Sequence, residues 1–166
     1  MIKGQDIVVL AVLLERGAEE LTFAELGKAA QVSASEAHAA VGRLQAASLV
    51  NSERKPVRGH VREFLVHGLR YAFPLQSAGK VVRGMPTSYA APVAADAFAS
   101  TGLLPVWENS SGSVYGQAYV PVYATAPVAA EADARLYDRL AVIDMLRGGR
   151  LRERQFAERK LQEMMS

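Results

Sequence analysis

The segment "LTFAELGKAAQVSASEAHAAVGRLQAASLV" (residues 21–50) contains the same helix-start signal twice. Thr22 is followed three residues later by Glu25, and Ser33 is followed three residues later by Glu36. In such a capping box, the hydroxyl oxygen accepts from a free N–H of the first helical turn, and the glutamate accepts from the N–H of the cap residue. The sequence therefore starts two helices in close succession.

A helix-turn-helix arrangement explains this close spacing. The preceding segment "GQDIVVLAVLLERG" has apolar residues at helical spacing and predicts a first, buried helix. The next two helices are expected over about 23–31 and 34–47, with Ala37, Val41 and Leu44 on the inner side of the last helix. The short connection leaves too little chain for antiparallel packing, so these two helices should cross steeply. A plain helical bundle is the alternative.

Residues 5–70 resemble the MarR-like winged helix-turn-helix of bacterial transcriptional regulators. The resemblance is carried by "FAELGKAAQVSASEAHAAVGRLQAASLV", which has a scaffold helix, the turn "VSAS", a recognition helix and the strand start "LV" in the expected order. Gly27 occupies the position where the two helices need a small residue, whereas Gln31 stands where many family members have glycine. The resemblance implies sequence-specific binding to double-stranded DNA.

The outward face of the predicted recognition helix carries small side chains. Small residues let a helix approach the DNA groove closely and touch thymine methyls, but they supply few bidentate hydrogen bonds. Arg43 is the best candidate for a guanine contact, with His38 and Gln45 behind it. An alanine-rich face that merely favours helix formation is the alternative. The residues of this helix and its turn predicted to bind DNA are Ser33, Ser35, His38, Ala39, Gly42, Arg43 and Gln45.

The segment after the recognition helix is basic and predicts a short wing. "SLVNSERKPVRG" has the pattern of a strand followed by a charged tip. "VREFLVHGLRYAF" then has helical spacing and ends at Pro74, so a fourth helix follows in place of a clear second wing strand. A basic loop beside a recognition helix is where such folds contact phosphates. The residues predicted to do so are Arg54, Lys55, Arg58, His60 and Arg62.

The middle of the chain has a different composition. Residues 71–128 hold most of the aromatic residues and six of the seven prolines. Within them, "SVYGQAYVPVY" alternates as a strand or hairpin arm does, after the turn signal "NSSGS". We expect an extended region with short strands that forms a small accessory core. A ligand pocket, including one for a small-molecule effector, and a partner surface remain open alternatives.

The C-terminal segment is predicted to be helical. "DARLYDRLAVIDMLRGG" aligns Leu136, Leu140, Ile143 and Leu146 on one face, and "RLRERQFAERKLQEMM" continues as a charged helix. Such a helix pair can form a homodimer interface, as binding to a two-fold operator would require. Packing against the chain's own core is the alternative.

The sequence lacks the motifs that are typical of several classes of function. The chain has no cysteine, which excludes disulfides, thiolate zinc sites and cysteine nucleophiles. Its three histidines have no metal-ligand spacing, and neither a phosphate-binding glycine loop nor a nucleophile elbow is found. "IVVLAVLL" is too short to cross a bilayer, and no signal-peptide pattern follows it. We therefore expect a cytoplasmic protein without enzymatic activity, cofactor, metal or membrane contact.

The predicted fold is mainly α with a small β component. It comprises a winged helix-turn-helix domain over residues 1–74, an aromatic-rich and proline-rich extension with short strands over 75–128, and a C-terminal helical dimerisation element over 129–166. The predicted function is that of a bacterial transcriptional regulator that binds DNA as a homodimer. The alternative is a protein-interaction module, for example one that binds a toxin or another defence-system component through the same fold.

Overall fold

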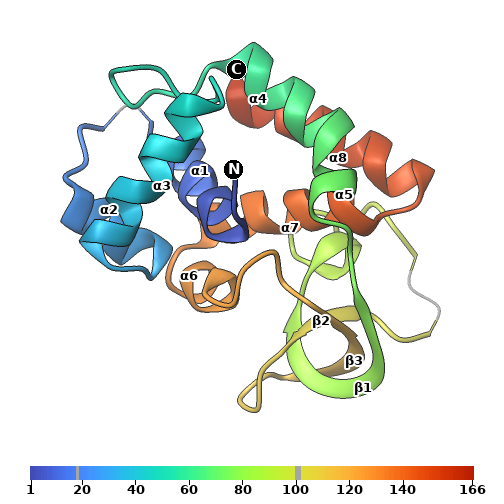
Figure 1. The fold of residues 1–166 in the computed structure, drawn as a ribbon. Coiled ribbons are helices and arrows are strands. Elements are labelled where there is room, and N and C mark those ends of the chain that lie inside the picture. The colour runs from blue at the N-terminus through green and yellow to red at the C-terminus, as the bar shows by residue number, and fades with distance from the viewer. Residues whose placement is uncertain (18, 100–101) are drawn as a thin grey trace.

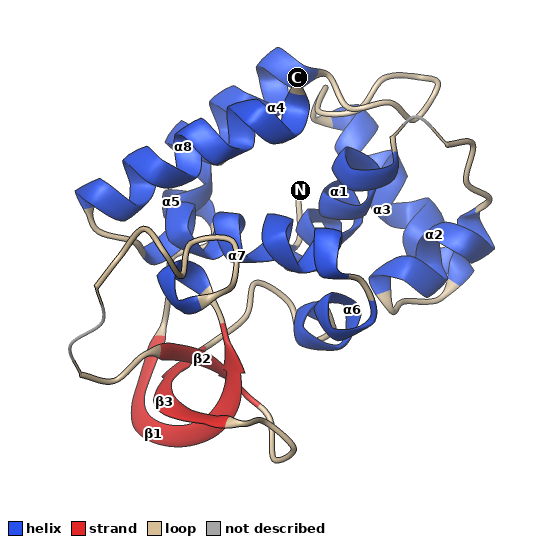
Figure 2. Cartoon of the chain, turned by 180° about the vertical axis from the view of Figure 1, so that it is seen from behind, coloured by secondary structure: helices blue, strands red, loops and turns tan. Residues whose placement is uncertain are grey.

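The computed structural model describes residues 1–17, 19–99 and 102–166. The chain is mainly helical with one small group of strands, as predicted (Figures 1 and 2). The elements are α1 (Gly4–Arg16), α2 (Phe23–Ala30), α3 (Ala34–Ala46), α4 (Arg58–Glu63), η1 (Phe64–Gly68), α5 (Leu69–Ala72), β1 (Ser77–Pro86), η2 (Ser88–Ala90), β2 (Pro105–Glu108), β3 (Val114–Tyr119), α6 (Ala126–Ala132), α7 (Ala134–Gly148) and α8 (Leu151–Met165).

Helix α1 is the central helix of the molecule. Residues 7–13 are apolar without interruption, and none of them is more than 5% exposed. A helix that is apolar on all sides must be covered on all sides. Helices α2, α3, α7 and α8 all pack against α1. The N-terminal helices and the C-terminal helices therefore meet on this one element.

Both predicted capping boxes are present at the starts of α2 and α3. The Glu25 N–H donates to Thr22 Oγ1 at 3.1 Å, and the Thr22 N–H donates to the Glu25 carboxylate at 2.9 Å. The corresponding distances between Glu36 and Ser33 are 3.1 and 3.3 Å. These bonds satisfy N–H groups that the first helical turn leaves free. The start of each helix is thereby fixed, as the sequence predicted.

The turn between α2 and α3 depends on two backbone features. Gln31 adopts the left-handed conformation, with φ 60° and ψ 42°, and the Val32 N–H donates to the Gly27 carbonyl at 2.8 Å. This conformation costs a non-glycine residue about 1 kcal/mol. A Cβ atom on Gly27 would lie only 2.6 Å from the Val32 carbonyl oxygen and 2.9 Å from that of Ser33. The prediction that Gly27 must be small is confirmed.

The connection after α3 is a short hairpin over residues 49–57. It contains one isolated antiparallel bridge, between Val50 and Pro56. The Val57 N–H donates to the Leu49 carbonyl at 2.9 Å and closes the base of the hairpin. Helix α4 follows directly and continues through the wide π-type turn of η1 into α5, which ends before Pro74. The predicted strand is therefore reduced to a bridge, whereas the predicted fourth helix is confirmed.

The strands close into a small barrel. Strand β1 pairs antiparallel with both β2 and β3, and β2 pairs parallel with β3. The prediction of β3 and of the turn before it is confirmed. The sequence did not predict strand β1, because Gly79, Gly84 and Pro86 are residues that argue against a strand. A Cβ on Gly84 would collide with the Trp107 carbonyl oxygen, so glycine permits the close approach of β2.

A buried carboxylate joins the barrel to α7. Asp144 is 2% exposed and accepts from Thr87 Oγ1 at 2.7 Å, from Trp107 Nε1 at 2.8 Å and from Arg147 at 2.8 Å. Arg147 also donates to the Phe73 carbonyl at 3.0 Å. A buried charge is tolerated when it is paired and hydrogen-bonded in this way. The aromatic region is thus tied to the helical core as an accessory layer.

The apolar face of α7 is filled by the chain's own core. Leu136, Leu140, Ile143 and Leu146 are only 1–2% exposed, so they cannot form the homodimer interface considered from the sequence. The reason is that α7 packs between α1 and α8, which cover this face. One hydrophobic cluster contains residues from all three predicted segments. None of the described helices is long and apolar enough to cross a bilayer.

Two glycine-to-alanine substitutions should have opposite effects on stability. Gly27→Ala should lower the free energy of unfolding by about 1–3 kcal/mol, because the added methyl meets backbone atoms that cannot move freely. Gly42→Ala, in the interior of α3, should raise it by up to about 1 kcal/mol, because a Cβ there meets nothing within 4 Å and alanine favours the helix. Urea denaturation measures both, and a destabilised Gly42→Ala protein would contradict the open position of that residue.

Candidate nucleic-acid interface

The outward face of α3 is open to solvent. Ser35, Ala39, Gly42 and Ala46 are all exposed, as predicted. Ser33 caps the helix through its hydroxyl, which also lies 3.2 Å from the hydroxyl of Ser35. Figure 1 shows α2 and α3 on one side of the molecule, away from the strands. The described part of the chain therefore leaves this face free for a partner. We call it small-sided because its side chains are all small.

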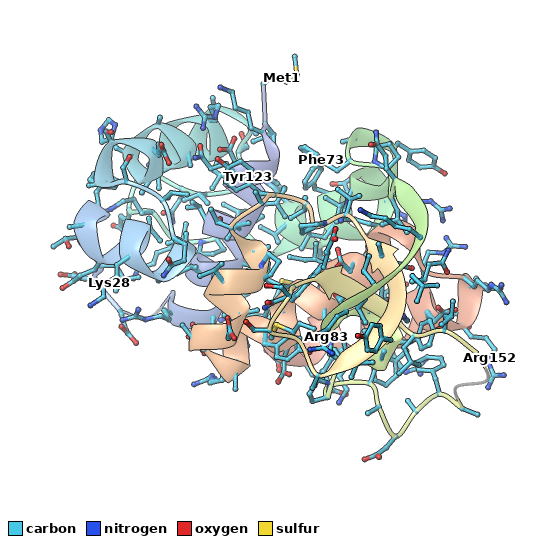
Figure 3. All side chains as sticks on the ribbon, turned by 90° about the horizontal axis from the view of Figure 1, so that it is seen from below. Met1, Lys28, Phe73, Arg83, Tyr123 and Arg152 are labelled. Carbon is cyan, nitrogen blue, oxygen red and sulfur yellow. The ribbon has the colours of Figure 1, made fainter. Side chains whose placement is uncertain are left out.

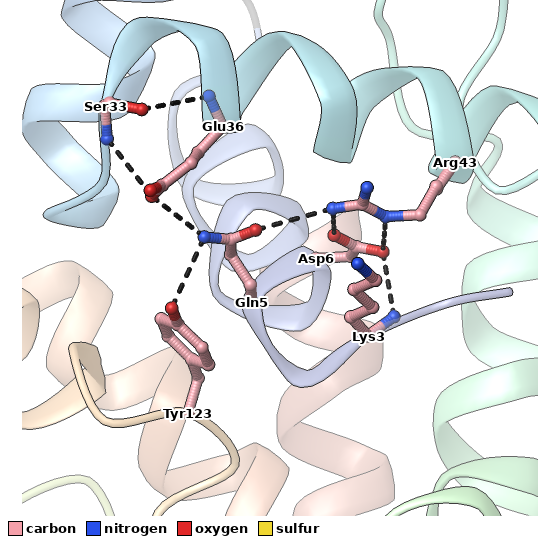
Figure 4. A network of polar contacts seen from close by, with 7 residues as sticks. All are labelled: Lys3, Gln5, Asp6, Ser33, Glu36, Arg43 and Tyr123. Atoms are coloured by element: carbon pink, nitrogen blue, oxygen red, sulfur yellow. Dashed lines mark hydrogen bonds and ion pairs between the residues drawn. The ribbon is translucent and has the colours of Figure 1, made fainter.

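Arg43 does not belong to the outward face. Its Nε and its terminal nitrogen donate to the two carboxylate oxygens of Asp6, each at 2.8 Å (Figure 4). Asp6 is fully buried, and the Arg43 side chain is only 22% exposed. The hydrogen bonds to Asp6 raise the pKa of Arg43. The expectation of a free guanine-reading Arg43 is corrected: a buried carboxylate requires a paired cation, and Arg43 supplies it.

This ion pair is part of a network that fixes α3 on α1. The backbone N–H of Lys3 donates to Asp6 at 2.9 Å. The Gln5 amide donates to the Glu36 carboxylate at 3.0 Å, and it lies 3.4 Å from the Tyr123 hydroxyl (Figure 4). The N-terminal turn of α1 thus holds α3 at its first turn and again near its end. The outward direction of the exposed face follows from these contacts.

Two further predicted residues of α3 rest against neighbouring elements. The ring of His38 meets Phe23 edge-on, with a centroid distance of 4.7 Å. The Gln45 amide donates to the Asn51 carbonyl of the short hairpin at 3.0 Å. His38 remains exposed and Gln45 is half-buried. Both side chains border the open face, but each already has a contact within the chain.

The basic tip of the short hairpin is folded back onto the connection between α1 and α2. Arg54 donates to the Leu21 carbonyl at 3.0 Å, and its guanidinium lies 4.8 Å from the centre of the Phe23 ring. Lys55 donates to the Gly17 carbonyl at 2.6 Å. The expectation of a free charged tip is corrected for these two residues. Their donors satisfy the Leu21 and Gly17 carbonyl groups of this connection.

The remaining predicted basic residues lie on α4 and differ in availability. His60 Nδ1 lies 2.7 Å from the Ser48 carbonyl oxygen, and Arg62 forms a 2.5 Å ion pair with Glu158 of α8. Arg58 is exposed, and no hydrogen bond or ion pair engages its side chain among the residues that the structure describes. Of the predicted phosphate contacts, Arg58 is therefore the one most available to a partner.

The other exposed basic residues lie on several elements, and Arg150, Arg152 and Arg159 belong to the α8 segment. Figure 3 shows Lys28, Arg83 and Arg152 on separate parts of the surface. Lys28 belongs to α2, whereas Arg83 lies on the barrel and stacks on Tyr115 at 5.0 Å. The outward face of α3 carries no basic side chain, and the Arg43 charge beside it is paired with Asp6. Contacts to phosphates from this surface should therefore be few.

Comparisons of the chain with protein families, with curated proteins and with solved structures find no match. Within the described residues, no group of three or more histidine, aspartate or glutamate side chains could hold a metal ion. Sequence reasoning missed Gln5, Asp6 and Tyr123. For Asp6 a signal existed, because an acidic residue directly before a long apolar run in a buried helix needs a cationic partner.

Arg43→Ala should lower the stability of the fold. The substitution leaves the buried Asp6 carboxylate unpaired, and we expect it to lower the free energy of unfolding by about 2–3 kcal/mol, somewhat less than a fully buried pair would give. Lys28→Ala, on the exposed side of α2, should change it by less than about 0.5 kcal/mol. Denaturant titrations of the Arg43→Ala, Asp6→Ala and Asp6→Ala/Arg43→Ala variants measure the coupling between the two side chains, with Lys28→Ala as the control. Additive single effects would show that the pair contributes nothing.

Proposed function

We propose that the chain is a sequence-specific DNA-binding transcriptional regulator whose residues 5–70 act as a MarR-like winged helix-turn-helix. The observation that carries the proposal is the open, small-sided face of α3, held in a fixed direction by the Asp6–Arg43 ion pair. In helix-turn-helix proteins the second helix of the motif enters the major groove, and the elements around it contact phosphates. In this chain that helix is α3, with the short hairpin in the place of the wing.

The small side chains determine how α3 would read DNA. Ala39 and Gly42 permit close approach of the helix to the base edges, and the Ala39 methyl can contact a thymine methyl. Ser35 supplies a hydroxyl near the start of the helix. Arg58 and Lys28 supply the phosphate contacts. Recognition would therefore rest on shape and apolar contact more than on bidentate hydrogen bonds.

A homodimer on a two-fold operator and a cytoplasmic location belong to this proposal. A single small-sided helix offers little discrimination, and a second copy about one helical turn away doubles the contacts. Because the apolar face of α7 is buried, the two copies would meet through another surface. The charged outer side of α8 is exposed at Arg152, Gln155 and Arg159 and is available for this contact.

A protein-interaction module is the second candidate. The observation that favours it is the absence of basic side chains from the outward face of α3, among the residues whose positions are described. The centres of protein–protein interfaces are depleted in charged residues, whereas interfaces with DNA are rich in them. In this case α3 would pack on a protein partner, for example a toxin or another defence-system component.

The test is a selection from a random duplex library with the full chain, followed by titration of the enriched duplex against salt. We expect a slope of log affinity against log salt of about −3 to −4, because Arg58 and Lys28 of each of the two copies carry the phosphate contacts. Gly42→Glu should weaken binding at least about tenfold by placing a carboxylate against the duplex, whereas Gly42→Ala should bind as the unmodified chain does. Failure to enrich any duplex would contradict DNA binding and favour the protein-interaction module.

A further inference from the structure

A cavity of about 430 Å³ lies between the end of α1, the short hairpin, α7 and the end of α8. Its apolar wall includes Leu14, Met164 and Met165, and its basic side includes Lys55, Arg58 and Arg139. A second, much smaller apolar space shares Leu14, Arg139 and the two methionines with it. We call the larger space the Arg139 cavity. It has the combination of apolar wall and convergent polar groups that ligand sites have.

Arg139 is the unusual residue of this cavity. Its side chain is buried, with only 9% of the residue exposed. One terminal nitrogen donates to the Arg135 carbonyl at 3.0 Å, but Nε has no hydrogen-bond partner. No carboxylate of the described residues lies within ion-pair distance of its guanidinium. Burial lowers the pKa of Arg139, which reflects the unfavourable environment of this charge.

One acidic side chain, Glu15, also lines the Arg139 cavity. Glu15 lies 4.0 Å from Arg135, and it interacts with the carboxylate of Asp133. Burial, followed by the hydrogen bond with Asp133, raises the pKa of Glu15. Glu15 forms no ion pair with Arg139, although its charge raises the pKa of Arg139 against the effect of burial. A buried guanidinium without an ion pair is destabilising, so an anion bound beside it would be favoured.

We infer that the Arg139 cavity binds a monovalent organic carboxylate with a short apolar chain. The carboxylate would accept from the guanidinium of Arg139, side-on through Nε and the neighbouring terminal nitrogen, once the side chain turns toward the cavity, because Nε is covered by the chain in this structure. The chain would lie along Leu14 and the two methionines. Methionine side chains rearrange readily, so the smaller apolar space can open to admit the end of the chain. This inference does not depend on whether α3 binds DNA.

The test uses octanoate as the probe, with acetate and octanamide as matched controls. Calorimetry with the full chain should show saturable octanoate binding, and octanoate should raise the melting temperature. Acetate lacks the apolar chain and octanamide lacks the charge, so each should bind at least about tenfold more weakly. Octanoate binding no stronger than that of both controls would overturn the inference.

Two substitutions in the Arg139 cavity, with one control substitution outside it, test where octanoate binds. Arg139→Gln should weaken octanoate binding at least about tenfold, whereas Arg83→Gln, the same substitution on the exposed surface of the barrel, should leave it unchanged. Met164→Trp fills the apolar wall and should also abolish binding, which keeps the test valid if Arg139→Gln does not fold. Nuclear Overhauser contacts should connect the octanoate chain to the Met164 and Met165 methyl groups. Unchanged octanoate affinity in folded Arg139→Gln or Met164→Trp protein, or contacts of the octanoate chain to other residues, would contradict the assignment.

Discussion

The buried carboxylate of Asp6 is the constraint on which the N-terminal half of the molecule depends. It stands in the first turn of a helix whose next seven residues are almost fully covered. Such a charge can be buried only beside a cation, and Arg43 is that cation. Because Arg43 must turn toward α1, the side of α3 that carries Ala39 and Gly42 must turn outward. The open face is therefore a consequence of burying α1.

A second buried carboxylate organises the other half of the molecule in the same way. Asp144 of α7 accepts hydrogen bonds from Thr87, Trp107 and Arg147 and so attaches the barrel to the helices. Since α1 and α7 pack on each other, the two polar centres lie on adjoining central helices of one core. The aromatic region thus supports the core, and the surface of α3 stays clear of it.

Local signals in the sequence predicted the local structure. The capping boxes at Thr22 and Ser33, the small residue at Gly27 and the helix end before Pro74 all follow from short-range chemistry, and the structure confirms each of them. These short-range signals do not show which residues distant in the sequence pair with each other. Helical periodicity placed Arg43 near the surface, and nothing within its own segment pointed to Asp6, which lies 37 residues away. The strand β1 was hidden for the same reason, because only its partners β2 and β3 stabilise its glycine-rich backbone.

We propose that Arg43 positions α3 while the small residues of α3 make the contact with DNA. An NMR titration of the ¹⁵N-labelled full chain with a selected duplex tests it most directly. We expect the largest shift changes at the amides of Ser35, Ala39 and Gly42, with the Nε–H signal of Arg43 unchanged because it stays bonded to Asp6. A large change of the Arg43 Nε–H signal, or amide changes confined to the barrel, would contradict it.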